Sequence, residues 1–378
     1  MINIRIYIMV CVLIPLGYAC KHSFDPPTIP AKSRPLVVEG FINSGADATT
    51  TVSLTRVQDV SIADTLLPEL HAVVFIEGQG GDKYPLLENG NGKYSADHLT
   101  LNAAQPYRLN ISTSNGSTYV SDYVPVKQTP PIDSLEWDQN TDVNVYVNTH
   151  DPLDSTRYYR WDYVETWNYS SNLTSPWDVS NRIIFVKDTI TLETDSCFRT
   201  DQSTDIVVGT TVALAHDVVS HQPVALVPIN SEKISKRYSI LVRQYALTKE
   251  AYQFHQTLQK NTQQTGSLFD PQPSQLPTNV HCTSNPNDIA IGFISASSVQ
   301  EKRIFIKHNQ VTDWTYIGSS VDCTPIFTSA NANFLIFDYP DTTYGPYYFV
   351  SGGGLVLVKR SCTDCRYWGG TNVIPAFW

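Results

Sequence analysis

Short runs of alternating apolar and polar residues fill the chain from residue 35 to residue 128. Roughly seven such runs follow one another at intervals of about 8–12 residues, a spacing typical of small β-sandwiches. Residues 50–56 alternate strictly, and the Asn/Gly-containing turns at 89–91 and 114–116 each separate two runs. Turns of this composition are typical of β-hairpins. We therefore expect residues 35–128 to form an N-terminal β-sandwich, either immunoglobulin-like or transthyretin-like.

A Thr-Pro-Pro boundary at residues 129–131 precedes a longer region, residues 132–378, that again shows strand patterns. Its most distinctive strand is the aromatic-rich segment 158–167. Alternation places on one face of that strand Tyr159, Trp161, Tyr163 and Glu165. Such rings either form a platform for sugars or belong to a sandwich core, and we favour the core. The pattern predicts a second, larger β-rich domain.

One stretch has a helical period instead of a strand period. Thr248 is a suitable N-cap, and Glu250 follows in the first turn, where its charge favours the helix dipole. The residues that recur at intervals of three or four are Ala251, Phe254, His255, Leu258 and Thr262. We expect a helix near residues 248–264 that packs on the second domain with Phe254 and Leu258 inward.

The helix is followed by a segment that cannot continue it. Gly266 suits a C-terminal cap, and the two prolines of residues 269–273 exclude further helix. We expect a fixed loop whose surface a partner protein contacts. The candidate contact residues are Phe269, Asp270 and Pro271.

Residues 1–19 are predicted to be a signal peptide. Arg5 supplies a short positive region, and an apolar run of signal-peptide length follows. Cys20 directly follows Ala19, a pattern typical of bacterial lipoproteins; a soluble secreted protein is the alternative. A lipidated Cys20 would anchor the protein to the membrane through its acyl chains. Residues 20–34, which are rich in proline, would form the tether, and Lys21 favours transport to the outer membrane.

Five cysteines remain beyond Cys20, and an odd number leaves one unpaired. The candidates for disulfides are Cys282, Cys323, Cys362 and Cys365, and the expected pairs are Cys282–Cys323 and Cys362–Cys365. A redox pair and a zinc half-site are alternatives for the CxxC sequence at 362–365, although zinc needs further soft ligands. Cys197 has no assigned role.

Composition and motifs favour a protein without catalytic or cofactor chemistry. With 42% apolar residues the chain is too apolar to be disordered, and its net charge of −10 disfavours nucleic acid as a partner. We find no nucleophile elbow, phosphate loop or metalloprotease helix. The nine histidines are scattered, so we predict no metal site, no cofactor and no catalytic residue.

Several longer motifs resemble one family. They are Leu36-Val37-Val38-Glu39-Gly40, Tyr158-Tyr159-Arg160-Trp161, Val242-Arg243-Gln244-Tyr245, residues 266–274, residues 292–296, and Cys362-Thr363-Asp364-Cys365-Arg366. On these the chain resembles a family of Bacteroidota outer-membrane lipoproteins known only as a domain of unknown function, serial 4249. The family often has a carboxylate where this chain has Ala376.

The resemblance implies an accessory role. Genes of the family often lie beside a SusC-like TonB-dependent transporter, so we expect a non-enzymatic, lipid-anchored outer-membrane protein that works with such a transporter in nutrient capture. The alternative is a surface glycan-binding protein or hydrolase that acts alone. The resemblance names no cargo.

Overall fold

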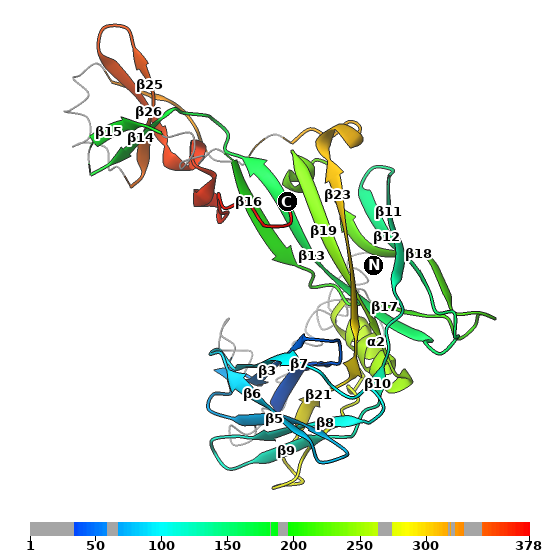
Figure 1. Cartoon of the computed structure of the whole chain (residues 1–378). Coiled ribbons are helices and arrows are strands. Elements are labelled where there is room, and N and C mark those ends of the chain that lie inside the picture. The colour runs from blue at the N-terminus through cyan, green and yellow to red at the C-terminus, as the bar shows by residue number, and fades with distance from the viewer. Residues whose placement is uncertain are drawn as a thin grey trace, which may run out of the picture.

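Figure 1 shows the computed structural model of the protein, which describes residues 34–58, 67–181, 183–187, 196–263, 274–316, 318, 322–328 and 342–378. Within these residues the chain is mainly β, with α2 (Lys249–Gln263) as the one α-helix. The strands gather into three parts. A first body and a small distal lobe lie at opposite ends, and a second body lies between them.

The first body, residues 34–58, 67–127 and 278–297, contains a ten-stranded sheet. In sheet order its strands are β20 (Val280–Cys282), β9 (Thr118–Ser121), β8 (Tyr107–Ser112), β5 (Val73–Gly78), β6 (Lys83–Glu88), β7 (Lys93–Leu99), β3 (Ala48–Arg56), β1 (Leu36–Gly40) and β21 (Ala290–Gly292), with β4 (Leu67–Pro68) paired to β3. One buried core contains Leu36 and Val52, which lie near one end of the strand order, together with Ile76 and Leu109, which lie near the other end. The sheet therefore folds over on itself into a β-sandwich.

Both predicted hairpins are confirmed. β6 pairs with β7 and β8 pairs with β9, each in antiparallel register. The connecting turns place Gly90 at φ 82° and Gly116 at φ 88°, a left-handed conformation that residues with a side chain adopt only with strain. The turn glycines thus fix where each hairpin reverses.

The first body is not continuous in sequence, unlike the domain predicted for residues 35–128. β21 pairs in parallel with β1, so that Leu36 lies opposite Ala290, and β20 extends the other edge beside β9. Val280 and Ile294 are part of the first body's core. The chain leaves the first body near residues 129–131 and returns to it about 150 residues later, and no local pattern could indicate that return.

The two crossings between the bodies lie side by side. β10 (Val126–Lys127), β22 (Ala296–Ser297) and β2 (Ile42–Asn43) form a small parallel sheet at this point. Just beyond it the Thr129 amide donates to Ser298 Oγ at 2.9 Å, and the Ala246 amide donates to Thr129 Oγ1 at 3.0 Å. Because Thr129 and Ser298 are both buried, these bonds are protected from water and stiffen the crossing.

The second body, residues 128–170, 196–263 and 298–316, is also sandwich-like. One sheet has the order β11 (Ile132–Gln139), β12 (Val143–His150), β18 (Val218–Val227). The other has β16 (Ser196–Gln202), β13 (Tyr158–Ser170), β19 (Arg237–Ala246) and β23 (Val299–Lys307), with β17 (Val207–Thr210) beside β13 and the short turns η2 (Glu232–Ile234) and η3 (His308–Gln310) at its end. Val145 and Val147 of the first sheet share one core with Trp161 and Ile240 of the second.

The aromatic face of β13 points into that core. Tyr159, Trp161 and Tyr163 are at most 8% exposed, and Glu165 beside them is 5% exposed. The Glu165 carboxylate accepts from the Tyr238 hydroxyl at 2.9 Å and pairs with Lys233. The core interpretation of this strand is therefore correct, and these rings are not available as a sugar platform.

Helix α2 begins where the sequence predicts. Thr248 Oγ1 accepts from the Ala251 amide at 3.2 Å, which satisfies one of the free donors of the first turn. Ala251 and Phe254 are buried and Leu258 is half-buried, so the predicted inward face is correct. Phe254 stacks on Phe293 of the first body at 5.6 Å, so the helix also contacts the first body.

The distal lobe, residues 171–181, 183–187, 322–328 and 342–368, consists of short elements. They are β14 (Trp177–Ser180), β15 (Ile183–Val186), β24 (Ile326–Thr328), β25 (Tyr344–Val350), β26 (Gly354–Lys359), η4 (Arg360–Cys362) and η5 (Cys365–Trp368). β26 lies between β24 and β25 and covers the predicted strand at 355–358. The strand predicted at 334–337 lies outside the described residues.

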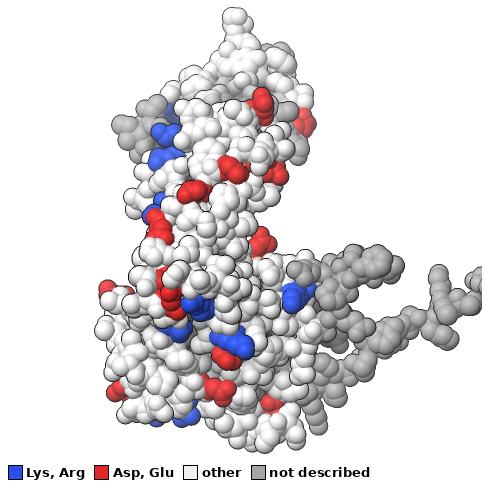
Figure 2. All heavy atoms as spheres, turned by 90° about the vertical axis from the view of Figure 1, so that its right-hand side faces the viewer, with Lys and Arg blue, Asp and Glu red and all other residues white. Residues whose placement is uncertain are grey.

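The surface shows no large field of one charge on the face seen in Figure 2, where acidic and basic side chains of the described residues are interspersed. In the part of the chain that the structure describes, no helix has the length and apolar character needed to cross a membrane. The signal peptide and the tether predicted for residues 1–34 lie almost wholly outside that part.

Candidate functional site

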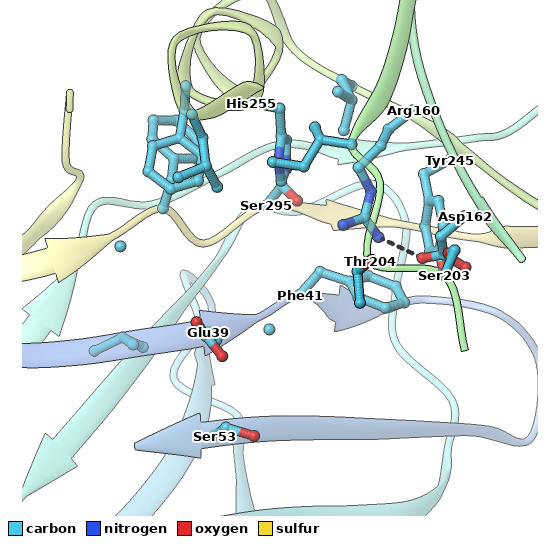
Figure 3. Close-up of a pocket in the computed structure, with 18 of the residues that line it drawn as sticks. Glu39, Phe41, Ser53, Arg160, Asp162, Ser203, Thr204, Tyr245, His255 and Ser295 are labelled. Atoms are coloured by element: carbon cyan, nitrogen blue, oxygen red, sulfur yellow. Dashed lines mark hydrogen bonds and ion pairs between the residues drawn. The ribbon is translucent and has the colours of Figure 1, made fainter. Parts of the chain in front are cut away.

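A cleft of about 530 Å³ lies where the first body, the second body and α2 meet (Figure 3). Glu39 and Phe41 line it from the end of β1, Arg160 and Asp162 from β13, and His255 from α2. A volume of this size is typical of sites for small molecules. The hydrogen-bonded crossing beside it holds the two bodies in place, so the cleft is formed before any ligand arrives.

Two arginines share one carboxylate in the wall of the cleft. Arg243 Nε donates to Asp162 Oδ1 at 2.5 Å, and Arg160 Nη2 donates to Asp162 Oδ2 at 3.1 Å. The side chains of both arginines are 23% exposed and that of Asp162 is 16% exposed. Burial acts to lower the pKa of Arg243, but the neighbouring Asp162 outweighs it and the pKa is raised. The trio therefore carries one excess positive charge.

The alternation of β13 explains why this trio faces the cleft. Residues with odd numbers from 159 to 165 enter the core, so Arg160 and Asp162 must lie on the opposite face. Register then places Asp162 directly opposite Arg243 on β19, which brings the carboxylate and the guanidinium together.

The aromatic rings around the trio have few free faces. The Arg160 guanidinium lies 4.2 Å above the centre of the Tyr245 ring, and the Phe41 ring meets Tyr245 edge-on at 5.0 Å. Phe254 and Phe293 stack on each other. Tyr245 is only 4% exposed, and burial, together with the charge of Asp162, raises the pKa of its hydroxyl.

His255 reaches into the cleft from α2, near Arg160 and Ser295 in Figure 3. Its ring meets Phe254 edge-on at 5.2 Å and makes no hydrogen bond with another described residue. Burial lowers the pKa of His255 to about 3, and the charge of Arg160 acts in the same direction. The imidazole is therefore neutral at physiological pH and offers one donor and one acceptor without charge.

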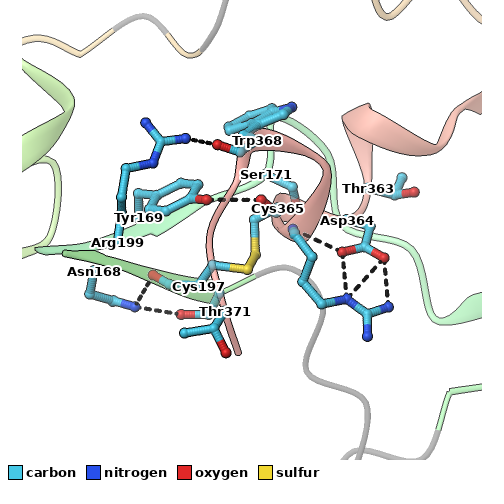
Figure 4. Close-up of a disulfide and its surroundings, with 12 residues drawn as sticks. Asn168, Tyr169, Ser171, Cys197, Arg199, Thr363, Asp364, Cys365, Trp368 and Thr371 are labelled. Carbon is cyan, nitrogen blue, oxygen red and sulfur yellow. Dashed lines mark hydrogen bonds and ion pairs between the residues drawn. A yellow bond between two sulfur atoms is a disulfide. The ribbon is translucent and has the colours of Figure 1, made fainter. Parts of the chain in front are cut away.

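The disulfides differ from the predicted pairs. Cys197 bonds to Cys365 (Figure 4) and Cys323 bonds to Cys362, each with a Cα–Cα distance of 5.8 Å, while Cys282 is free. The expected pairs Cys282–Cys323 and Cys362–Cys365 are therefore wrong. Cys282 is buried in the core of the first body, away from the other four.

The CxxC sequence serves two different bonds because its cysteines lie in successive turns. Cys362 ends η4 and Cys365 begins η5, so the two thiols face different neighbours. Close to the Cys197–Cys365 bond, the Tyr169 hydroxyl donates to the Cys365 carbonyl at 2.8 Å (Figure 4). The two disulfides connect β16 of the second body and residue 323 to the turns at the base of the distal lobe.

The remaining predicted site residues cannot be placed. Cys20 and the contact candidates Phe269, Asp270 and Pro271 lie outside the described residues. Among the described residues no group of three His, Cys, Asp or Glu side chains is arranged to hold a metal ion. The Arg160–Asp162 pair was not predicted, although the polar face of an otherwise aromatic strand was a usable signal.

No curated protein sequence matches the chain. A family model does match, over residues 21–303, and its description is Domain of unknown function (DUF4249). The match covers about three quarters of the chain, including both strands that carry the arginine pair and helix α2. The protein therefore belongs to the DUF4249 family.

Proposed function

We propose that the protein is a non-enzymatic accessory lipoprotein of the outer membrane that captures a nutrient for a SusC-like TonB-dependent transporter. The cleft between the two bodies is the observation that best supports a binding role. It is formed in advance, it is large enough for a small molecule, and its polar groups come from several elements that are fixed by packing. These are properties of a binding site.

The chemistry of the cleft favours binding over catalysis. A general base works best when its pKa lies near the operating pH. His255 is the imidazole in the cleft, and a pKa of about 3 makes it a poor base at neutral pH. Both oxygens of the Asp162 carboxylate are already hydrogen-bonded to arginines, Oδ1 to Arg243 and Oδ2 to Arg160, so neither oxygen is free to attack a substrate.

The location rests on three independent supports. The segment before Cys20 is typical of a lipoprotein signal. The family resemblance implies an outer-membrane lipoprotein whose gene neighbours encode a transporter. Two disulfides are common in proteins outside the cytoplasm and rare within it.

Affinity purification of a C-terminally tagged protein from detergent-solubilised outer membranes tests the proposal. We expect a β-barrel transporter to co-purify, and we expect Cys20→Ala to move the protein to the soluble fraction. Asp270→Ala should weaken co-purification while leaving folding intact, because Asp270 is a predicted contact residue. A protein that purifies alone, and that by itself hydrolyses or binds glycans, would support the surface hydrolase or glycan-binding alternative.

A further inference from the structure

If the cleft binds a ligand, as the proposed function requires, its chemistry indicates the class of that ligand. We propose that the cleft binds a small organic acid, with its carboxylate held by Arg160 and Arg243 and its apolar body against Phe41, Phe254 and Phe293. All five residues line the same cleft.

The arginine pair has unused capacity for a carboxylate. A guanidinium carries roughly five N–H donors. Arg160 and Arg243 each use one of theirs on Asp162, and no further hydrogen bond joins either side chain to a described residue. The remaining donors lie in a partly desolvated wall, where charge-assisted bonds to a carboxylate are strong and are often made in pairs.

The half-buried charge in the cleft wall, two arginines against the single Asp162 carboxylate, favours an anion. Glu39 and Asp205 line the cleft and Glu301 lies opposite Arg243 on β23, but all three are exposed. Water and salt screen exposed charges much more than half-buried ones. The excess charge of the half-buried arginine pair is therefore the field that a ligand meets inside the cleft. His255 adds polar contacts without adding charge.

The covered ring faces argue against a sugar ligand. A sugar needs an open aromatic face for stacking, yet Arg160 covers one side of Tyr245, and Phe41 contacts the same ring. Phe254 is buried and stacks on Phe293. These rings offer edges and apolar surface, which suit an apolar body with an acidic end.

Isothermal titration of the soluble form that lacks residues 1–20 tests the ligand class with two probes. N-acetyl-L-phenylalanine has the acid and an aromatic body, and N-acetyl-L-phenylalaninamide has the same body without the charge. We expect the acid to bind at least about tenfold more tightly than the amide, because the amide cannot accept the paired charged bonds.

Variants then locate the site. Arg160→Gln should weaken acid binding by about tenfold or more. Arg108→Gln is the matched control, because Arg108 also pairs with a carboxylate, Glu77 at 2.6 Å, and lies 4.7 Å over the Tyr123 ring, but outside the cleft. It should leave acid binding unchanged. Circular dichroism checks that both variants are folded.

Equal affinity for acid and amide, no acid binding at millimolar concentration, or equally tight binding of maltotriose would overturn the proposal. Each of these results comes from the wild-type protein and does not depend on whether a variant folds. Co-purification with a transporter is unaffected by the outcome, so failure of the ligand class remains distinguishable from failure of the proposed function.

Discussion

Gln244 is the residue whose replacement tests the construction of the second body most sharply. It is fully buried on β19, and its side chain makes three hydrogen bonds. Trp161 Nε1 donates to Gln244 Oε1 at 2.8 Å. Gln244 Nε2 donates to the Pro130 carbonyl at 2.8 Å and to Thr149 Oγ1 at 3.0 Å. One amide thus connects the two sheets with the crossing between the bodies.

Replacing Gln244 by Leu keeps a similar volume but removes all three bonds. Thr149 loses least, since its hydroxyl still donates to the Pro131 carbonyl at 2.8 Å. The indole N–H of Trp161 and the Pro130 carbonyl are left buried without this partner. An unsatisfied buried group costs about 1–3 kcal/mol, so two of them predict a loss of about 2–6 kcal/mol in the free energy of unfolding.

Urea unfolding followed by tryptophan fluorescence measures this loss. If the two bodies unfold in separate transitions, each transition is fitted on its own. Gln222→Leu is the control, because the Gln222 side chain makes one bond, to the carbonyl of neighbouring Pro223 at 3.2 Å. We expect the control to lie within about 0.5 kcal/mol of wild type. A change below about 1 kcal/mol in Gln244→Leu would refute the reasoning.

Three further predictions follow from single features. Leu258→Asp should destabilise the protein by about 1–3 kcal/mol, because it places a charge on the half-buried face of α2. Gln253→Asp, on the exposed face of the same helix, should change the stability little. Equal melting temperatures for the two variants would exclude the packing of α2 through Leu258. Burial acts to raise the pKa of Asp151, but bonds from the Ser155 hydroxyl and three backbone amides outweigh it and lower the pKa to about 2. This stabilisation is present above the unfolded pKa of about 3.9 and is lost as pH falls towards 2, so Asp151→Asn should be less stable at pH 7 and should converge with wild type in acid; a constant difference would contradict this. Peptide mapping without reduction should recover the two disulfides described above, and Cys282 should react with an alkylating agent only after unfolding; a peptide with an internal CxxC bridge would contradict it.

Features set by neighbouring residues could be predicted from the sequence. The hairpin turns at Gly90 and Gly116 depend on local backbone conformation, and alternation grouped Trp161 with the residues of the face that is buried in the core. The helix was recognisable because Thr248 and the apolar spacing from Ala251 onwards agree with each other. Each of these signals lies within a single hairpin, strand or helix.

Features that join distant segments could not be predicted. The pairing of Leu36 with Ala290 carries no local signature. The odd number of cysteines shows that one thiol is unpaired, but it does not show which cysteines bond to each other. Cys197 and Cys365 are brought together only by the folded chain. The cleft has the same origin, because its walls come from β1, β13, β19 and α2, which are separated by long stretches of sequence. Its charge pattern becomes visible only when these elements are brought together.

A cryo-electron microscopy map of the tagged protein isolated from outer membranes is the most direct test of the proposed function. We predict a particle in which a TonB-dependent β-barrel lies against this protein and the cleft beside Arg160 opens towards the path of the cargo. A particle that contains this protein alone, or a barrel bound so that it seals the cleft from the cargo path, would contradict it.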